Sequence, residues 1–460
     1  MAALSTPPAH AAEDATSTAA ARRDLAVTIY NENLALVRDA REVTLDKGER
    51  RLAFADVSAQ IRPETAALKA DGLRVLEQNF DFDLLTPAAL LEKAVGETVR
   101  LYRRHPTTGI DSVESATVLS AAGGGVVLKI GDRIEVMQDS HFPGRIVFDK
   151  IPPNLRARPT LSMTLNVAKA GTRSVELAYL TRGLSWKADY VGVLDAAETT
   201  LALTGLVTLT NRAGVAFADA LVQLVAGDVN QVRQADIRFE AAPRGVAAMA
   251  APPVAEEALG DYHLYTLARR TTIADNQTKQ VTFLTAPKVK TAKTYRYRAH
   301  GFATDEQARS VAVEYRFDNR AQAGLGLALP RGVVRVYASD KAGRAQFVGE
   351  DAIAHTAKNE TVVLTLGRAF DVKARGRTVT DDLIARSRDS ETREITQAYV
   401  LTNAKDQPVT VLLDQTMWGD WQILSSSVAA EKADARTARF AVSVPAEGET
   451  TLDFTVRTRR

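Results

Sequence analysis

The chain has 460 residues and no cysteine, and its 58 Lys and Arg against 56 Asp and Glu give a formal net charge of +2. A charge this small excludes a bulk nucleic-acid binder, because neutralising many phosphates requires a matching surplus of basic side chains. The lack of cysteine excludes disulfides, thiolate zinc sites, iron–sulfur clusters and a cysteine nucleophile. The hydrophobic content of 45% is that of a soluble globular protein, and the length predicts roughly three domains.

Residues 1–23, rich in Ala, Pro, Ser and Thr, are expected to be a disordered leader remnant, because they cannot bury enough surface to offset their ordering entropy. Within them, Ala9-His10-Ala11 has the small-x-small form of a signal-peptidase site, although the basic start and apolar core of a secretory signal are missing. We interpret the segment as a signal peptide truncated by a start codon placed too far downstream; the alternative is an Ala-rich tail. The first interpretation predicts the periplasm or cell envelope. No stretch of the chain approaches the roughly 18 apolar residues of a membrane span.

Residues 24–96 are expected to form an N-terminal β subdomain with one short helix. Alternation of apolar and polar residues predicts strands at 26–30, 34–45 and 50–57. The last two would form a hairpin through residues 46–49, which contain a glycine suited to positive φ. A helix is predicted over 86–96, because Thr86 can cap it, a proline suits its first turn, and Gly96 can end it.

Residues 97–145 are expected to form a small closed barrel of the SH3-like kind. Four short strands separated by glycine-containing turns are predicted there, at residues 97–103, 112–120, 125–130 and 133–136. Strands this short cannot hide an apolar face alone, so closure into a barrel is the economical solution.

Two larger β regions follow. Residues 146–375 are expected to form a central β-sandwich, because strand-like segments recur at intervals of about 8–12 residues with turn residues between them. The Pro/Ala-rich stretch 241–260 interrupts this region as a loop. Residues 376–460 are expected to form an immunoglobulin-like β-sandwich held by its core alone. The predicted fold class is therefore mainly β, with few short helices.

The stretch 76–85 (LEQNFDFDLL) is the most unusual in composition. As a strand it would place the carboxylates of Glu77, Asp81 and Asp83 on one face. These oxygens are candidate ligands for a hard cation such as calcium, although their spacing is not that of a calcium loop. The alternative is a solvated face that protects a sheet edge from aggregation.

No assembled catalytic set is found along the chain, and no cofactor site is predicted. The six histidines are scattered without metal-ligand spacing. Residues 183–187 (GLSWK) match a nucleophile elbow only in part, because Lys187 stands where glycine is required. If acids meet only in the folded protein, Asp81, Asp83 and Asp189 are the candidates for a glycan-active hydrolase.

Several strings of residues share the pattern of one family. They are 30–38 (YNENLALVR), 76–85 (LEQNFDFDLL), 143–148 (PGRIVF), 179–190 (YLTRGLSWKADY), 224–230 (LVAGDVN), 347–356 (FVGEDAIAHT) and 369–372 (AFDV). Together they resemble the bacterial family known as domain of unknown function 4139, from about residue 25 to the C-terminus. The resemblance implies a predominantly β protein, often exported, of uncharacterised role and without known catalytic residues. Related mucoidy inhibitor proteins carry a similar C-terminal region behind a coiled-coil segment, and no long heptad pattern occurs here.

The sequence therefore favours a non-enzymatic β protein of the bacterial periplasm or envelope that binds a protein or glycan partner. Two alternatives stay open. One is a glycan-active hydrolase whose carboxylates are brought together by the fold, and the other is a calcium-stabilised module of the adhesion type.

Overall fold

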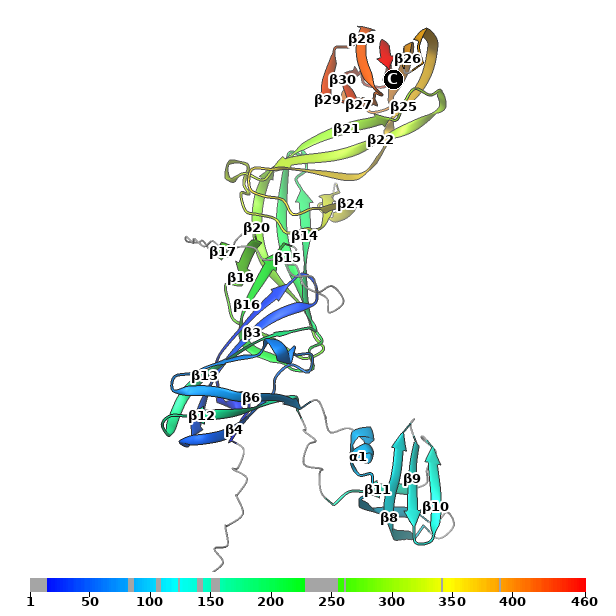
Figure 1. Cartoon of the computed structure of the whole chain (residues 1–460). Helices are drawn as coiled ribbons and strands as arrows, with labels where there is room; N and C mark the ends of the chain where they lie inside the picture. Colours follow the sequence, from blue (N-terminus) through cyan, green and yellow to red (C-terminus); the bar gives the residue numbers. More distant parts are fainter. Residues whose placement is uncertain are drawn as a thin grey trace, which may run out of the picture. The chain divides into compact units, whose positions relative to one another are not determined.

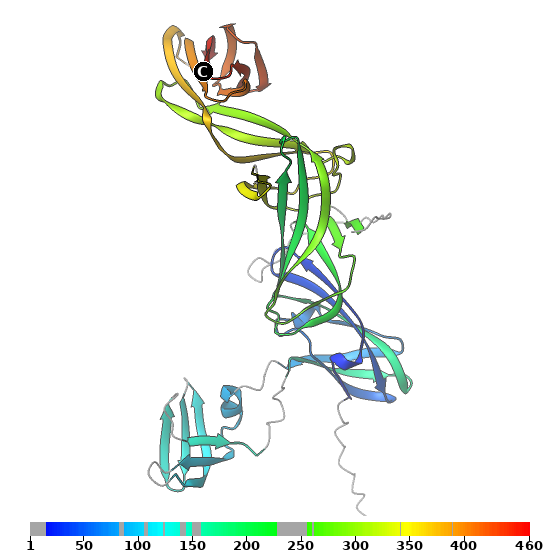
Figure 2. The same ribbon diagram turned by 180° about the vertical axis from the view of Figure 1, so that it is seen from behind.

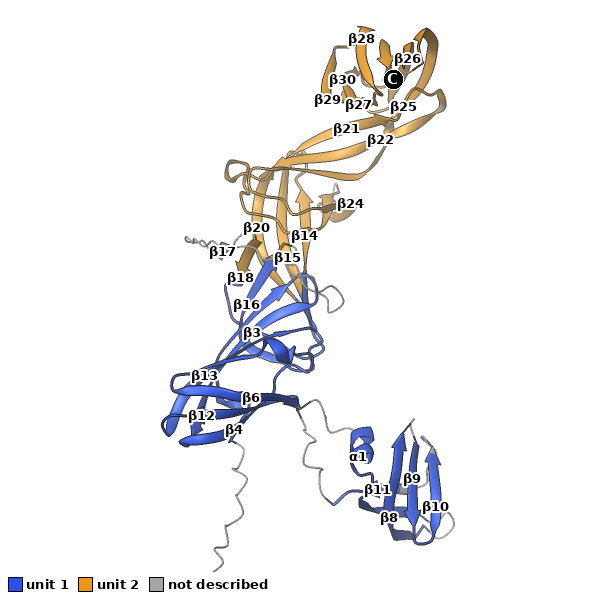
Figure 3. Cartoon of the chain, in the orientation of Figure 1, with its two compact units in different colours: residues 1–186, 209–225, 266–279 blue, residues 187–208, 226–265, 280–460 orange. Residues whose placement is uncertain are grey.

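The computed structural model describes residues 15–81, 87–104, 109–122, 125–138, 144–149, 158–227, 255–259, 262–340, 342–388 and 390–460. Strands dominate these residues, and α1 (Pro87–Lys93) is the one α-helix among them, which confirms the predicted mainly β class. None of the described helices has the length and apolarity that crossing a membrane requires. The chain divides into two compact units (Figure 3): unit 1 comprises residues 1–186, 209–225 and 266–279, and unit 2 comprises residues 187–208, 226–265 and 280–460.

One sheet of unit 1 has four strands. Its order is β1 (Ala15–Ser17), β4 (Gly48–Ala55), β12 (Thr160–Val167) and β6 (Leu73–Asp81). β1 runs parallel to β4, and the other neighbours are antiparallel. β6 is therefore an edge strand of this sheet, which places the start of the acidic stretch 76–85 at an edge.

A second sheet contains the longest strands of unit 1. The members in this unit are, in order, β16 (Phe217–Ala226), β2 (Arg22–Tyr30), β3 (Leu34–Leu45), β13 (Gly171–Thr181) and β5 (Ala67–Lys69), and β19 (Thr271–Ile273) pairs with β16. Two 3-10 turns, η1 (Ala19–Ala21) and η2 (Pro63–Thr65), lie between strands of this unit. Apolar residues of the central strands, such as Val27, Val37 and Leu177, are fully buried.

The predicted disorder of residues 1–23 is wrong for its described part, residues 15–23. β1 pairs with β4, and the guanidinium of the fully buried Arg41 donates to the Ser17 carbonyl oxygen at 2.8 Å. A buried arginine satisfies its donors with whatever acceptors surround it, so this polar contact holds a segment that is poor in apolar residues. Ala9-His10-Ala11 lies outside the described residues.

The predicted hairpin between residues 34–45 and 50–57 is also wrong. β3 pairs with β2 and β13, whereas β4 pairs with β1 and β12 in the other sheet. Gly48 does adopt positive φ, at 100°, but here it turns the chain from one sheet into the next. Turn chemistry therefore predicted the turn at Gly48 but not the pairing partner of β4.

A third sheet of unit 1 lies where the small barrel was predicted. Its strands are antiparallel, in the order β10 (Arg133–Gln138), β9 (Gly125–Ile130), β8 (Asp111–Ala122), β7 (Thr98–Arg104) and β11 (Gly144–Val147). The helix predicted over 86–96 is confirmed as α1, and its Leu91 packs on the core of this sheet together with Phe148. The described strands do not close into a barrel, because β10 and β11 remain its two edges. Leu91 and Phe148 contribute to covering the apolar face, so burial here does not depend on closure.

Unit 2 contains a mixed five-stranded sheet. Its order is β20 (Thr278–Lys290), β15 (Thr200–Asn211), β14 (Leu184–Leu194), β23 (Gly332–Ser339) and β24 (Ala345–Ile353). β14 and β23 run parallel, and β24 is antiparallel to β23. β17 (Ala255–Leu259), a neighbour of β18 (Tyr262–Thr266), falls within the predicted loop 241–260, whose remainder lies outside the described residues.

The largest sheet of unit 2 has nine strands. They are, in order, β28 (Asp420–Ser426), β31 (Gly448–Arg459), β26 (Glu391–Asn403), β25 (Thr361–Arg386), β22 (Asp305–Asp318), β21 (Ala292–Ala299), β27 (Val409–Thr416), β30 (Thr437–Val444) and β29 (Ala430–Asp434). Figures 1 and 2 show β21 and β22 running side by side, and the 3-10 turn η3 (Ala321–Ala323) follows β22.

The two ends of the nine-stranded sheet share one apolar core. Phe440 of β30 and Phe454 of β31 stack with their ring centroids 4.9 Å apart, although their strands are far apart in sheet order. Leu413 and Leu401, both fully buried, belong to the same core. The sheet therefore folds over on itself. The predicted domain boundary at 375/376 falls inside β25, which continues without a break to Arg386.

Candidate functional site

Asp189, predicted as a catalytic candidate, lies in β14 with its side chain only 8% exposed. Its carboxylate contacts the Arg335 guanidinium at 2.9 Å and the Lys187 ammonium at 3.4 Å. The Thr208 hydroxyl donates to the second oxygen at 3.2 Å. Burial opposes ionisation, but the hydrogen bond from Arg335 and the charge of Lys187 outweigh it, so the pKa of Asp189 lies below its usual range.

These contacts commit Asp189 to the ionised form. A general acid must hold a proton near neutral pH, and a nucleophilic carboxylate needs a free oxygen facing a substrate. Arg335 also contacts Glu350, at 3.1 Å, so the cation joins β14 to β24 across β23. The arrangement is that of an ion pair within a sheet.

The acidic stretch 76–85 is described only as far as Asp81. Glu77 is exposed on the edge strand β6, and Asp81 ends that strand opposite Thr160 of β12. Asp83 lies outside the described residues, so a calcium site of Glu77, Asp81 and Asp83 stays a prediction. Nowhere in the described stretches do three or more acids or histidines gather in a way that could hold a metal ion.

Sequence reasoning missed a group of paired charges that crosses four neighbouring strands of unit 2, here called the ion-pair ladder. Its members are Glu314 of β22, Arg296 and Arg298 of β21, Asp414 of β27 and Arg439 of β30. Arg296 contacts Glu314 at 2.7 Å and Asp414 at 2.6 Å, and Arg439 contacts Asp414 at 2.7 Å. The Glu314 side chain is 1% exposed, so the ladder belongs to the folded framework.

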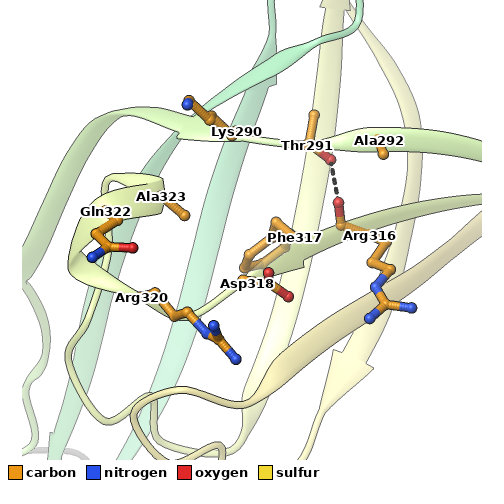
Figure 4. Close-up of a pocket in the computed structure, with 9 residues that line it drawn as sticks. All are labelled: Lys290, Thr291, Ala292, Arg316, Phe317, Asp318, Arg320, Gln322 and Ala323. Carbon is orange, nitrogen blue, oxygen red and sulfur yellow. Dashed lines mark hydrogen bonds between the residues drawn. The ribbon is translucent and has the colours of Figure 1, made fainter.

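Close to the ladder in sequence, a pocket of about 380 Å³ opens where β20, β21, β22 and η3 meet (Figure 4). We call it the cationic pocket, and its lining residues are Lys290, Thr291, Ala292, Arg316, Phe317, Asp318, Arg320, Gln322 and Ala323. In Figure 4 the guanidinium groups of Arg316 and Arg320 flank the carboxylate of Asp318.

The walls of the cationic pocket are fixed by buried contacts. Phe317 is 3% exposed and forms an apolar base, while the fully buried Asn319 holds the turn that carries η3. The Asn319 amide donates to the Leu327 and Ala357 carbonyl oxygens at 2.6 and 2.9 Å and accepts from the Gly326 N–H at 3.0 Å. Three hydrogen bonds to one side chain in the interior leave this turn little freedom, so the pocket is formed before any ligand arrives.

The charges of the cationic pocket are unbalanced. Lys290, Arg316 and Arg320 are all exposed, and no carboxylate of the described chain lies within ion-pair distance of any of them. Asp318 is the one acid in the lining, and it accepts a hydrogen bond from the Thr361 hydroxyl at 2.7 Å. Three cations against one carboxylate favour an anionic ligand.

Sequence reasoning did not find this pocket, because Lys290 lies more than 20 residues before Arg316 and Arg320, and each of the three looks like an ordinary surface residue. Comparison with known proteins adds no site residues: neither a scan of protein-family models nor a search of curated proteins finds a match to the chain.

Proposed function

We propose that the protein is an exported, non-enzymatic binding protein of the bacterial envelope whose ligand is an acidic glycan. The observation that carries this proposal is the preformed cationic pocket with three cations that lack partners among the described residues. Arginine presents several N–H donors in a plane that matches a carboxylate, and the guanidinium groups of Arg316 and Arg320 lie on either side of the Asp318 carboxylate (Figure 4). A uronic acid offers such a carboxylate.

The rest of the lining suits the hydroxyls of a sugar. Asp318 accepts hydrogen bonds, the Gln322 amide both donates and accepts, and Phe317 supplies an apolar base. A volume of about 380 Å³ lies in the range of small-ligand sites. Cleavage of a glycosidic bond usually needs two carboxyl groups, and this pocket has one. Binding without turnover is therefore the function that this pocket supports best.

Export and family membership are part of the same proposal. The small-x-small sequence Ala9-His10-Ala11 and the resemblance to the domain of unknown function 4139 family support them. We further propose that the C-terminal sandwich predicted over 376–460 is immunoglobulin-like and also takes in β21, β22 and the first part of β25, which the shared core of the two sheet ends supports. Sequencing the N-terminus of protein from a native periplasmic fraction tests export: a start at Ala12 supports it, and a retained Met1 in the cytoplasm contradicts it.

Titration calorimetry with tri-galacturonate, a chain of three uronic acids, tests the ligand class. The double variant Arg316→Ala/Arg320→Ala should bind this probe about tenfold more weakly or worse, since each charge-assisted hydrogen bond contributes about 1.5–3 kcal/mol. The matched control is Arg375→Ala/Arg377→Ala, which removes two exposed arginines from β25 of the same unit. Two results would contradict the proposal. One is that both double variants bind tri-galacturonate equally well, and the other is that the wild type cleaves it and releases new reducing ends.

A protein partner is the second candidate, favoured by the edge strand β10. Ile134 and Val136 are 64% and 67% exposed and share one face of this strand. An apolar edge strand can accept an extended segment of a partner through backbone hydrogen bonds. A photo-crosslinker placed at position 134 in native envelopes, compared with the same crosslinker in the Val136→Lys background, tests this candidate: one crosslinked partner that Val136→Lys no longer engages would support it.

A further inference from the structure

A second pocket of unit 2 is lined in part by Phe370, a residue that is 86% exposed. Exposing a phenylalanine to this extent costs free energy in water, and folded proteins rarely present one unless it contacts something. The alternation of β25 buries Val362 and Leu364 and would be expected to bury or half-bury an aromatic residue as well. The exposure of Phe370 therefore needs a structural cause.

The cause is an irregularity in β25. Arg368 is opposite Ala312 of β22 and Lys373 is opposite Ser310, so four residues of β25 face the single residue Val311. Within this bulged segment Ala369 and Val372 are buried, whereas Phe370 points to solvent. Such bulges re-aim side chains and occur next to functional sites.

The hollow beside Phe370 has a volume of about 670 Å³, and we call it the aromatic pocket. It is built from the bulge of β25, the end of β26 and the turn before β31. The lining residues are Phe370, Asp371, Lys373, Thr402, Asn403, Ala404, Glu447, Gly448 and Glu449.

Buried hydrogen bonds hold these three segments together. The side chain of Asn403, in a residue only 2% exposed, donates to the Gln407 and Pro445 carbonyl oxygens at 2.8 and 2.9 Å. The Ala404 N–H donates to the Asp371 carbonyl oxygen at 2.8 Å, which ties the bulge to β26. The aromatic pocket is therefore rigid where it meets a ligand. Binding does not incur the entropy cost of ordering loops.

The charges of the aromatic pocket decide between ligand classes. Glu447 and Glu449 are exposed, have no cation partner within the described stretches, and repel an anion, whereas Asp371, the third acid of the lining, is paired with Lys405 at 3.8 Å. The Lys373 ammonium lies 5.8 Å from the centre of the Phe370 ring, so a second cation on that ring would meet a like charge. A neutral ligand is repelled neither by the two glutamates nor by Lys373.

A neutral sugar fits the remaining chemistry. Its C–H face is apolar and can lie on the Phe370 ring, while its hydroxyls donate to the carboxylates of Glu447 and Glu449 and accept from Lys373. We infer that the aromatic pocket is a binding site for a neutral hexopyranose. It shares no residue with the cationic pocket, so either site can be lost while the other keeps its ligand.

Saturation-transfer NMR and titration calorimetry on the full chain, with cellohexaose and maltohexaose as neutral probes, test this inference. We expect Phe370→Ala to bind the preferred probe at least about tenfold more weakly and Phe370→Trp to retain binding. The matched control is Phe347→Ala, another exposed phenylalanine of unit 2, at 56%, which should bind like the wild type.

Three results would overturn the inference: no binding of either neutral probe by the wild type, wild-type binding by Phe370→Ala, or stronger binding of hexalysine than of both sugars. Unchanged far-ultraviolet circular dichroism of Phe370→Ala shows that a loss of binding is not a loss of fold. Binding of tri-galacturonate by Phe370→Ala separates this site from the acidic-glycan proposal, because only the cationic pocket serves that probe.

Discussion

Strand β22 carries two charged side chains that differ in burial and in pairing. Glu314 is 1% exposed and is contacted by two arginines, whereas Arg316, two residues later on the same face, is exposed and has no carboxylate partner among the described residues. Glu314 lies opposite Thr294 of β21, in the interior of the sheet, and Arg316 lies opposite Ala292, the first residue of that strand. The ion-pair ladder therefore ends where the sheet ends, and the cationic pocket begins there.

The difference separates charges that the fold requires from charges that remain available to a ligand. A buried ion pair costs desolvation, and removing one partner leaves the other without compensation. Exposed cations without partners cost little, because water already solvates them. Mutation of the ion-pair ladder should consequently change the stability of the fold. Mutation of the cationic pocket should change ligand binding and leave stability nearly unaltered.

Glu314→Ala should have the largest effect. It removes the charge-assisted hydrogen bonds that Arg296 and Arg298 donate to this buried carboxylate, so the free energy of unfolding should fall by about 3 kcal/mol or more. Urea denaturation followed by circular dichroism measures this loss. Arg316→Ala, on the same strand, should stay within about 0.5 kcal/mol of the wild type. Equal losses in both variants would remove the distinction between the ladder and the pocket.

Gly324→Ala probes the frame of the cationic pocket rather than its charges. This glycine has φ 91°, and an added Cβ would lie 2.1 Å from the Lys288 carbonyl oxygen, so we expect a loss of about 2 kcal/mol or more. Gly343→Ala is the control, because Gly343 also has positive φ, at 76°, but has open space around it. A stability loss no larger than that of the control would show that the turn adapts and is not a rigid frame.

Acid should weaken the ladder through Asp414. Burial raises the pKa of this carboxyl, but hydrogen bonds from Arg439 and Arg296 outweigh burial and hold the pKa below its usual range. The stabilisation is therefore present above the unfolded pKa of about 3.9 and is lost as pH falls through the folded value. Asp414→Asn should cost about 1–3 kcal/mol at pH 7, and its difference from the wild type should shrink between about pH 4 and pH 2. A constant difference across that range would contradict the assignment.

Chelation should have the smallest effect. The exposed Glu77 on β6 resembles Arg316 in having no charged partner among the described residues, and a solvated carboxylate at a sheet edge needs no metal. We expect the same melting temperature with and without EDTA, measured by scanning calorimetry. A fall of several degrees would instead show that a metal ion stabilises the chain, with the stretch 76–85 as its predicted site.

The positions of strands could be predicted well from the sequence, because alternation of apolar and polar residues reports burial on one face. Strands β3 and β9 begin and end where the alternation predicts. Pairing could not be predicted in the same way. The turn at Gly48 is visible locally, but the choice of partner for β4 depends on β12, which lies more than 100 residues further along the chain.

The candidate functional residues also depend on partners that are distant in the sequence. Asp189 could be recognised as an unusual acid in a strand, but its partner Arg335 lies 146 residues away and turns it into an ion pair. Of the cations of the cationic pocket, Lys290 lies more than 20 residues before Arg316 and Arg320, and none of the three has a local signature. Phe370 stands within the string AFDV that carries part of the family resemblance, yet its exposure arises from pairing with β22.

The length of β25 has a mechanical consequence. Its 26 residues span about 85 Å when extended. Residues 361–376 pair with β22 and residues 372–386 pair with β26, so the two stretches of pairing overlap. A load applied along this strand would pull against both partners in shear, which strains many hydrogen bonds at once instead of opening them one by one. A protein built in this way can transmit tension along β25 without a flexible joint at residue 375.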